Sequence, residues 1–218
     1  MRYIITLTLA ISFCCAQPIS VSAGFKLGAP LNDPSAAKTL GTSYVQGRWT
    51  GGPTVELHLP HRFSLEFDAL YRNYQRNTTS SFQLAPNVNS YLASTANKTN
   101  AWDFPILLKY RFQVGSLHPF ISGGYGFTHE SSHGSYKFSC TGPIGSCRPA
   151  DYPSELGAGT SRSSHNERGP VAGLGLDFRR GPITITPEFR FSRATYGAYP
   201  QDNRFTALVG FSFGKRFR

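Results

Sequence analysis

The segment from Trp102 to Phe112 alternates between apolar and charged or polar residues over most of its length. The apolar set is Trp102, Phe104, Ile106, Leu108, Tyr110 and Phe112, and the other set includes Asp103, Lys109 and Arg111. Because successive side chains of a β-strand point to opposite faces, this pattern predicts a strand with one apolar and one largely charged face. The apolar face carries aromatic residues at both ends, which is typical of a strand that crosses an outer membrane between two aromatic girdles.

Eight segments of the chain alternate in this way. They span residues 19–27, 54–59, 63–72, 102–112, 117–127, 172–178, 183–191 and 205–213. The connections after the second, fourth and sixth segments are short, whereas the others are long, polar and rich in Asn, Ser, Gly and Thr. This predicts an all-β fold, an eight-stranded antiparallel up-and-down transmembrane β-barrel with short periplasmic turns and long extracellular loops. The alternative fold is a soluble, lipocalin-like barrel.

The N-terminal segment from Met1 to Ala16 has an early Arg2, an apolar run and then small residues. This is the pattern of a secretory signal peptide. Cleavage after Ala16 or after Ala23 fits the sequence, and we favour Ala16 because the strand-like alternation already begins at Ile19. The sequence therefore predicts a signal peptide over residues 1–16 and a barrel domain over residues 17–218.

The formal net charge of +10 raises the question of a nucleic-acid partner. An exported chain without a Lys/Arg run or a nucleic-acid motif argues against one. Partners that carry phosphate groups outside the cell, such as lipopolysaccharide, are compatible with the charge. Cys140 and Cys147 lie close together in a Gly- and Pro-containing segment, and in an oxidising compartment they predict a disulfide bond.

Acidic and basic residues occur in similar numbers on the inward phase of the predicted strands. The predicted lumen charge network contains Glu56, Glu66, Asp68, Arg72, Asp103, Lys109, Arg111, Asp177, Glu188 and Arg190, with Lys26 on the same phase. Pairing offsets much of the free energy needed to bury a charge, so this balance predicts a structural network that fills a narrow barrel. The alternative is a small ion-conducting pore lined by these charges.

Residues 129–133 have the sequence H-E-x-x-H, which binds zinc in metalloproteases when it lies on a helix. Here we expect the motif to leave a strand and enter a loop, because no helical apolar period surrounds it. We therefore expect no catalytic, cofactor-binding or metal-ligating residues. A lipid-A-modifying enzyme that pairs His129 or His133 with Ser131 or Ser132 is a second alternative.

The alternating pattern and the C-terminal sequence ALVGFSFGKRFR resemble the eight-stranded outer-membrane barrels that include the OmpA membrane domain and OmpX. In that family the last aromatic positions form an insertion signal, which corresponds to Val209, Phe211, Phe213 and Phe217; Lys215 and Arg218 depart from the pattern. The resemblance implies a monomer in the bacterial outer membrane with no cofactor. It also implies a non-enzymatic structural or adhesive role through the loops, and contacts with outer-membrane lipid, lipopolysaccharide and the outer-membrane assembly machinery.

Overall fold

The computed structural model describes residues 19–32, 42–83, 90–114, 117–141, 158–194 and 202–214, nearly all of them in β-strands. The strands are β1 (Ser20–Pro30), β2 (Thr42–His58), β3 (Phe63–Asp68), β4 (Leu70–Gln83), β5 (Ser90–Arg111), β6 (His118–Thr141), β7 (Ala158–Arg180), β8 (Ile183–Ala194) and β9 (Asp202–Gly214). One short 3-10 turn, η1 (Pro60–Arg62), joins β2 to β3. Within this part of the chain, no helix is long and apolar enough to cross a membrane.

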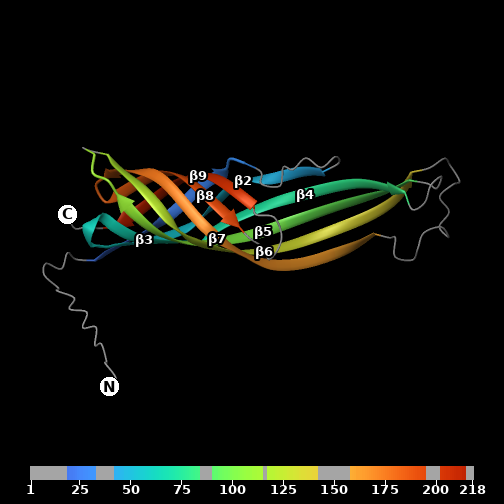
Figure 1. The fold of residues 1–218 in the computed structure, drawn as a ribbon, viewed down its shortest axis with the longest axis horizontal. Helices are drawn as coiled ribbons and strands as arrows, with labels where there is room; N and C mark the ends of the chain where they lie inside the picture. The colour runs from blue at the N-terminus through green and yellow to red at the C-terminus, as the bar shows by residue number, and fades with distance from the viewer. Residues whose placement is uncertain are drawn as a thin grey trace, which may run out of the picture.

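The strands form one antiparallel sheet that closes on itself, because β1 pairs with β2 on one side and with β9 on the other (Figure 1). β3 and β4 act as a single strand of the barrel, since both keep one register against β5, and they keep one register against β2 as far as the pair Thr50–Arg72. The break between them falls at Ala69, which lies opposite Pro53 and donates its N–H to the Pro53 carbonyl at 3.0 Å. Proline has no N–H with which to return that bond. The predicted eight-stranded antiparallel barrel is therefore confirmed.

The two faces of the barrel wall are inverted relative to a soluble protein. Ile106 on the outer face is 40% exposed, whereas Lys109 on the inner face is 1% exposed. Aromatic rings lie near both ends of the apolar outer face. Phe63, Tyr110 and Phe112 form a turn-side girdle with ring centroids 5.0 Å apart, and Trp49, Tyr71 and Trp102 form a loop-side girdle with centroids 5.2–6.1 Å apart. This arrangement is that of a wall surrounded by lipid.

The strands β4, β5, β6 and β7 continue furthest beyond the loop-side girdle, whereas β8 and β9 end near it (Figure 1). β5, β6 and β7 contain 22, 24 and 23 residues, and their ladders continue to the pairs Ser90–Thr141 and Lys137–Ala158. We call residues 73–83, 90–100, 129–141 and 158–170 of β4, β5, β6 and β7 the extension. The sequence predicts loops for these residues, and this prediction is wrong: they are paired strands whose Ser-, Thr- and Asn-rich faces show no apolar alternation.

Candidate functional site

Six charged side chains from four strands meet in the lumen at a level between the two girdles. They are Lys26, Glu66, Asp68, Lys109, Glu188 and Arg190, and we call them the inner network. The Lys26 ammonium donates to Glu66 at 2.5 Å and to Glu188 at 2.8 Å. Arg190 donates to Glu188 at 2.7 Å and to Asp68 at 2.8 Å, and Lys109 donates to Glu66 at 2.7 Å. Three acids therefore balance three bases at side chains that are at most 6% exposed.

A second group of polar residues, the turn-side cluster, surrounds Arg111. Its guanidinium donates to Asp177 at 2.6 Å and to Ser64 at 2.5 Å, and it pairs with Glu56. On the far side of Glu56, His58 Nδ1 lies 3.5 Å from the carboxylate and His58 Nε2 lies 3.0 Å from the Ser22 hydroxyl.

The order Ser22–His58–Glu56 is that of a hydrolase triad, which also needs N–H donors for an oxyanion. Ser22 is paired on both sides, with Glu56 in β2 and with Gly214 in β9, so the neighbouring backbone groups are engaged in the sheet. Glu56 also pairs with Arg111 rather than serving His58 alone. Ser22, His58 and Glu56 are thus tied to the sheet and to Arg111 at the turn-side end of the lumen.

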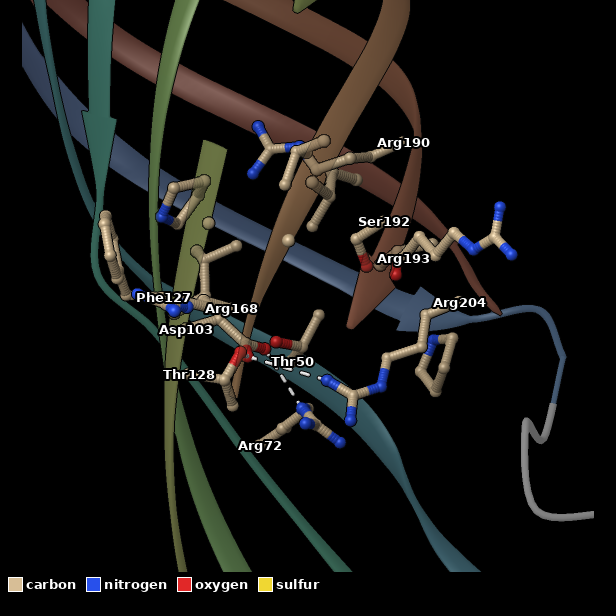
Figure 2. A pocket seen from close by; sticks show the side chains of 18 of the residues that line it. Thr50, Arg72, Asp103, Phe127, Thr128, Arg168, Arg190, Ser192, Arg193 and Arg204 are labelled. Atoms are coloured by element: carbon tan, nitrogen blue, oxygen red, sulfur yellow. Dashed lines mark hydrogen bonds and ion pairs between the residues drawn. The ribbon is translucent and has the colours of Figure 1, made fainter. Parts of the chain in front are cut away.

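The third group lies at the opposite end of the lumen, at the level where the extension begins. It contains Arg72, Tyr74, Asp103, Glu130, His165, Glu167 and Arg204, and we call it the mouth cluster. Arg72 donates to Asp103 at 3.0 Å and to Glu130 at 2.7 Å. Arg204 reaches from β9 to Glu167 on β7 at 2.7 Å. Figure 2 shows Arg72 and Arg204 converging on Asp103 from two sides.

A cavity of about 80 Å³ lies in the loop-side half of the lumen and is lined by Arg190 of the inner network and by residues of the mouth cluster (Figure 2). Its apolar lining includes Leu70, Pro105, Val171 and Leu208, and its polar lining includes Arg190 and Arg204. One water molecule needs about 10–15 Å³ measured in this way, so the cavity has room for several waters. The lumen is thus open to water near its mouth and filled by paired charges below it.

The sequence matches the family model of the outer membrane protein beta-barrel domain over residues 6–214. The chain belongs to this outer-membrane β-barrel family. It is therefore an outer-membrane protein, and the short connections of its barrel are the periplasmic ones. No curated protein matches the sequence at a significant level.

Three solved barrels of this kind are similar to the chain at low identity. The N-terminal barrel of OprF from Pseudomonas aeruginosa is 13% identical with a TM-score of 0.41, and the match covers 90% of this chain and 98% of that one. Ail from Yersinia pestis is 12% identical with a TM-score of 0.37, covering 89% and 97%. Neisserial surface protein A is 12% identical with a TM-score of 0.36, covering 91% and 97%.

The structure brings the charged residues that were assigned to the lumen into three separate groups. Glu66, Asp68, Lys109, Glu188 and Arg190 lie in the inner network, Glu56, Arg111 and Asp177 in the turn-side cluster, and Arg72 and Asp103 in the mouth cluster. Each of these ten side chains makes at least one ion pair. Lys26, which has the same inward phase, contacts three carboxylates and lies at the centre of the inner network.

Five members of the mouth cluster were not assigned to the lumen from the sequence, namely Tyr74, Glu130, His165, Glu167 and Arg204. Glu130 was placed in a loop with the H-E-x-x-H motif, and this placement was wrong, because residues 129–133 lie within β6. In a strand, Glu130 points into the lumen while His129 and His133 point outward and are exposed. His129 contacts Asn166 and His133 contacts Arg162, so the motif is divided between two faces. Ser122 and Thr128, two inward-facing residues of the same strand, have even numbers. Continuing this alternation along the strand would have assigned Glu130 to the lumen.

The remaining site residues stay predictions. Val209, Phe211 and Phe213 of the C-terminal signal lie on the outer face of β9, whereas Phe217 lies outside the described residues. Cys140 lies in β6, and Cys147 falls outside the described part of the chain, so the disulfide bond is untested. The predicted signal peptide is also outside it; Ala23, the second cleavage position, lies within β1 and pairs with Val55 and Phe213.

Proposed function

We propose that this outer-membrane barrel is a non-enzymatic surface-interaction protein whose extension contacts partners outside the cell. The observation that carries the proposal is the length of β5, β6 and β7, which contain 22–24 residues. A strand needs about 9–11 residues to cross an outer membrane. The remainder continues as paired strands for roughly 35–50 Å at about 3.3 Å per residue. Barrel closure does not need this ordered sheet, so the sheet is available for an external role.

The chemistry of the extension favours an anionic partner. Its exposed charged side chains in the described part of the chain are all basic: Arg76, Lys98, Lys137, Arg162 and Arg168. Its two acids there, Glu130 and Glu167, both point into the mouth cluster. The other exposed side chains are mainly Ser, Thr and Asn, which hydrogen-bond readily. A positive, hydroxyl- and amide-rich surface fits a polysaccharide that carries phosphate or sulfate groups, and lipopolysaccharide is the candidate nearest to it.

The lumen supports a role without transport or catalysis. Its middle is filled by the inner network, whose six charges are paired with one another. The Ser22–His58 contact lies within this narrow interior instead of facing lipid, where a lipid-modifying enzyme would need its nucleophile. We further propose that the protein is a monomer without a cofactor, contacting lipid through its apolar outer face and the assembly machinery through its C-terminal strand.

The test removes the outer part of the extension and leaves its base and the barrel. Asn73 pairs with Asn100, and Ser131 pairs with Ser164, so each hairpin can be closed at these pairs with an Asn-Gly turn that keeps the ladder and removes Arg76, Lys98, Lys137 and Arg162. The trimmed and full-length proteins are displayed on a Gram-negative host, and binding to dextran sulfate and to purified lipopolysaccharide is measured. We expect both proteins to insert, as seen from heat-modifiable gel mobility, and only the full-length protein to bind.

A matched control keeps the extension and removes its exposed charge, by changing Arg76, Lys98, Lys137, Arg162 and Arg168 to Gln. This variant should insert normally and lose most of its binding, with the residual binding insensitive to salt. Equal binding by the trimmed and full-length proteins would contradict the proposal. A change in the mass of lipid A on expression, abolished by Ser22→Ala, would instead establish the lipid-modifying enzyme.

A further inference from the structure

Three metal-ligating side chains converge in the mouth cluster. His165 and Glu167 are two residues apart on β7 and share its inner face, and Glu130 lies directly opposite His165 in the ladder of β6 and β7. His165 Nε2 is 3.2 Å from Glu130 Oε2 and 3.5 Å from Glu167 Oε1. The ligand atoms of all three residues lie within 4.8 Å of one another.

These separations match the spacing of ligands around a small divalent cation. Zinc binds imidazole nitrogen and carboxylate oxygen at about 2.0–2.2 Å in a tetrahedral arrangement, which places neighbouring ligand atoms about 3.3–3.6 Å apart. The two measured separations, 3.2 Å and 3.5 Å, are close to this range. A cation between the three atoms therefore needs only a small adjustment of the side chains.

The opposite oxygens of the two carboxylates are held by arginines. Glu130 Oε1 accepts from Arg72 at 2.7 Å, and Glu167 Oε2 accepts from Arg204 at 2.7 Å. Each glutamate is thereby oriented with its other oxygen toward His165, as outer partners orient ligands in metal sites. Glu130 Oε2 also accepts from the Tyr74 hydroxyl at 2.8 Å, and a carboxylate oxygen has lone pairs for both this bond and a metal.

Charge and access also favour a cation at this position. The mouth cluster has three carboxylates, on Asp103, Glu130 and Glu167, against two arginines, on Arg72 and Arg204. A divalent cation offsets this excess of negative charge. The Glu130 side chain is 2% exposed, whereas that of His165 is 27% exposed, so the site is open on one side to the extracellular solvent. That side leaves room for water as a fourth ligand.

We propose that Glu130, His165 and Glu167 form a binding site for a divalent transition metal of the zinc type at the extracellular mouth of the barrel. The metal joins β6 to the part of β7 that lies beyond Val171, where the described pairing of β7 with β8 ends. A nitrogen ligand beside two oxygens selects zinc over magnesium, which prefers oxygen ligands alone.

The test is calorimetric titration of the purified full-length barrel, in micelles free of lipopolysaccharide, with ZnCl₂ and separately with MgCl₂. We expect one zinc site per chain and no comparable magnesium site. His165→Ala and Glu167→Gln should each weaken zinc binding at least tenfold. His129→Ala and His133→Ala are matched controls, because these histidines are exposed on the outer face of the same region, and they should bind zinc as the unmodified protein does.

X-ray absorption at the zinc edge separates this site from the two cysteines. The proposed site gives only nitrogen and oxygen neighbours at about 2.0–2.2 Å, whereas cysteine ligands would add sulfur at about 2.3 Å. Heat-modifiable mobility shows that each variant is folded. The proposal is overturned if the folded protein binds no zinc, if sulfur neighbours appear, or if binding is lost in the His129 or His133 variants and kept in the His165 variant.

Discussion

Charged side chains are paired and exposed differently in two regions of the molecule, the barrel between the girdles and the region beyond the loop-side girdle. In the inner network, three acids face three bases, and none of the side chains is more than 6% exposed. In the mouth cluster, three acids face two arginines, and the side chains of His165 and Asp103 are 27% and 25% exposed. The first group is balanced and dry, whereas the second is unbalanced and reached by water.

This difference follows from the surroundings of each group. An unpaired ion costs several kcal/mol where water is excluded, so the inner network tolerates no surplus charge. Water and salt screen a charge near the mouth, so an unpaired charge there costs little free energy. The outer faces differ in the same way, because lipid requires an apolar surface between the girdles and solvent accepts a polar one beyond them. The barrel between the girdles therefore requires paired charges inside and apolar side chains outside, whereas the outer region can carry polar and unpaired charged side chains on both faces.

The largest effect should come from removing one member of the inner network. Glu66→Ala leaves the ammonium groups of Lys26 and Lys109 and the guanidinium of Arg190 short of a carboxylate. Breaking a buried pair in this way costs about 3–5 kcal/mol. Urea unfolding of the barrel in lipid vesicles measures the change in the free energy of unfolding.

A double variant is the control for this result. Glu66→Leu with Lys109→Leu removes a pair together and should be less destabilised than Glu66→Leu alone, because fewer unpaired charges remain. If Glu66→Ala unfolds at the same urea concentration as the unmodified barrel, the inner network is not dry and the contrast with the mouth fails.

The next largest effect should appear on the outer face between the girdles. Ile106→Arg places a charge in the lipid band and should cost about 2–4 kcal/mol. Thr79→Arg introduces the same side chain on the exposed outer face of the extension and should change stability by less than about 0.5 kcal/mol. Equal effects in unfolding and membrane-insertion assays would show that the loop-side girdle does not mark the edge of the membrane.

The sequence predicts the barrel between the girdles well because the two faces of each strand have different surroundings there. Lipid on one side and paired charge on the other produce the contrast between Ile106 and Lys109, and the alternation follows directly. Beyond the girdle both faces meet water, and this contrast disappears. Consecutive residues such as Thr78 and Thr79, or Ser131 and Ser132, are both polar. No apolar alternation therefore distinguishes these strands from loops in the sequence. Pairing with neighbouring strands, rather than local preference, makes them strands.

The grouping of the lumen charges could not be predicted for a different reason. Alternation gives the face on which a side chain lies, but its height in the barrel depends on strand tilt and stagger. Arg204 on β9 meets Glu167 on β7 because β8 ends near this level, and no local pattern records where β8 ends. Glu130 was obscured by a motif whose meaning depends on a helix that is not formed here.

A small effect should follow from the matching substitution at the mouth. Glu167→Gln removes the partner of Arg204 but leaves it close to Glu130, and the site is partly solvated. We expect a cost of about 1 kcal/mol or less in the free energy of unfolding. Measured without zinc, this cost should shrink further in 1 M NaCl, where screening acts over about 3 Å. A cost as large as that of Glu66→Ala would show that the two clusters do not differ in their exposure to water.

The smallest effect should be the ion current through the intact protein, which we expect to equal the membrane baseline. The inner network pairs three acids with three bases across the full width of a barrel whose interior is just wide enough for side chains. A conducting pore would more naturally carry one sign of charge in excess or be lined by small residues. Planar-bilayer recordings test this, with Glu167→Gln as a control that should also stay silent because the mouth cluster does not seal the lumen. Stable conductance steps that change when Glu66 or Lys109 is neutralised would mean that the paired charges line a water-filled path, and the barrel would then be a small ion-selective pore.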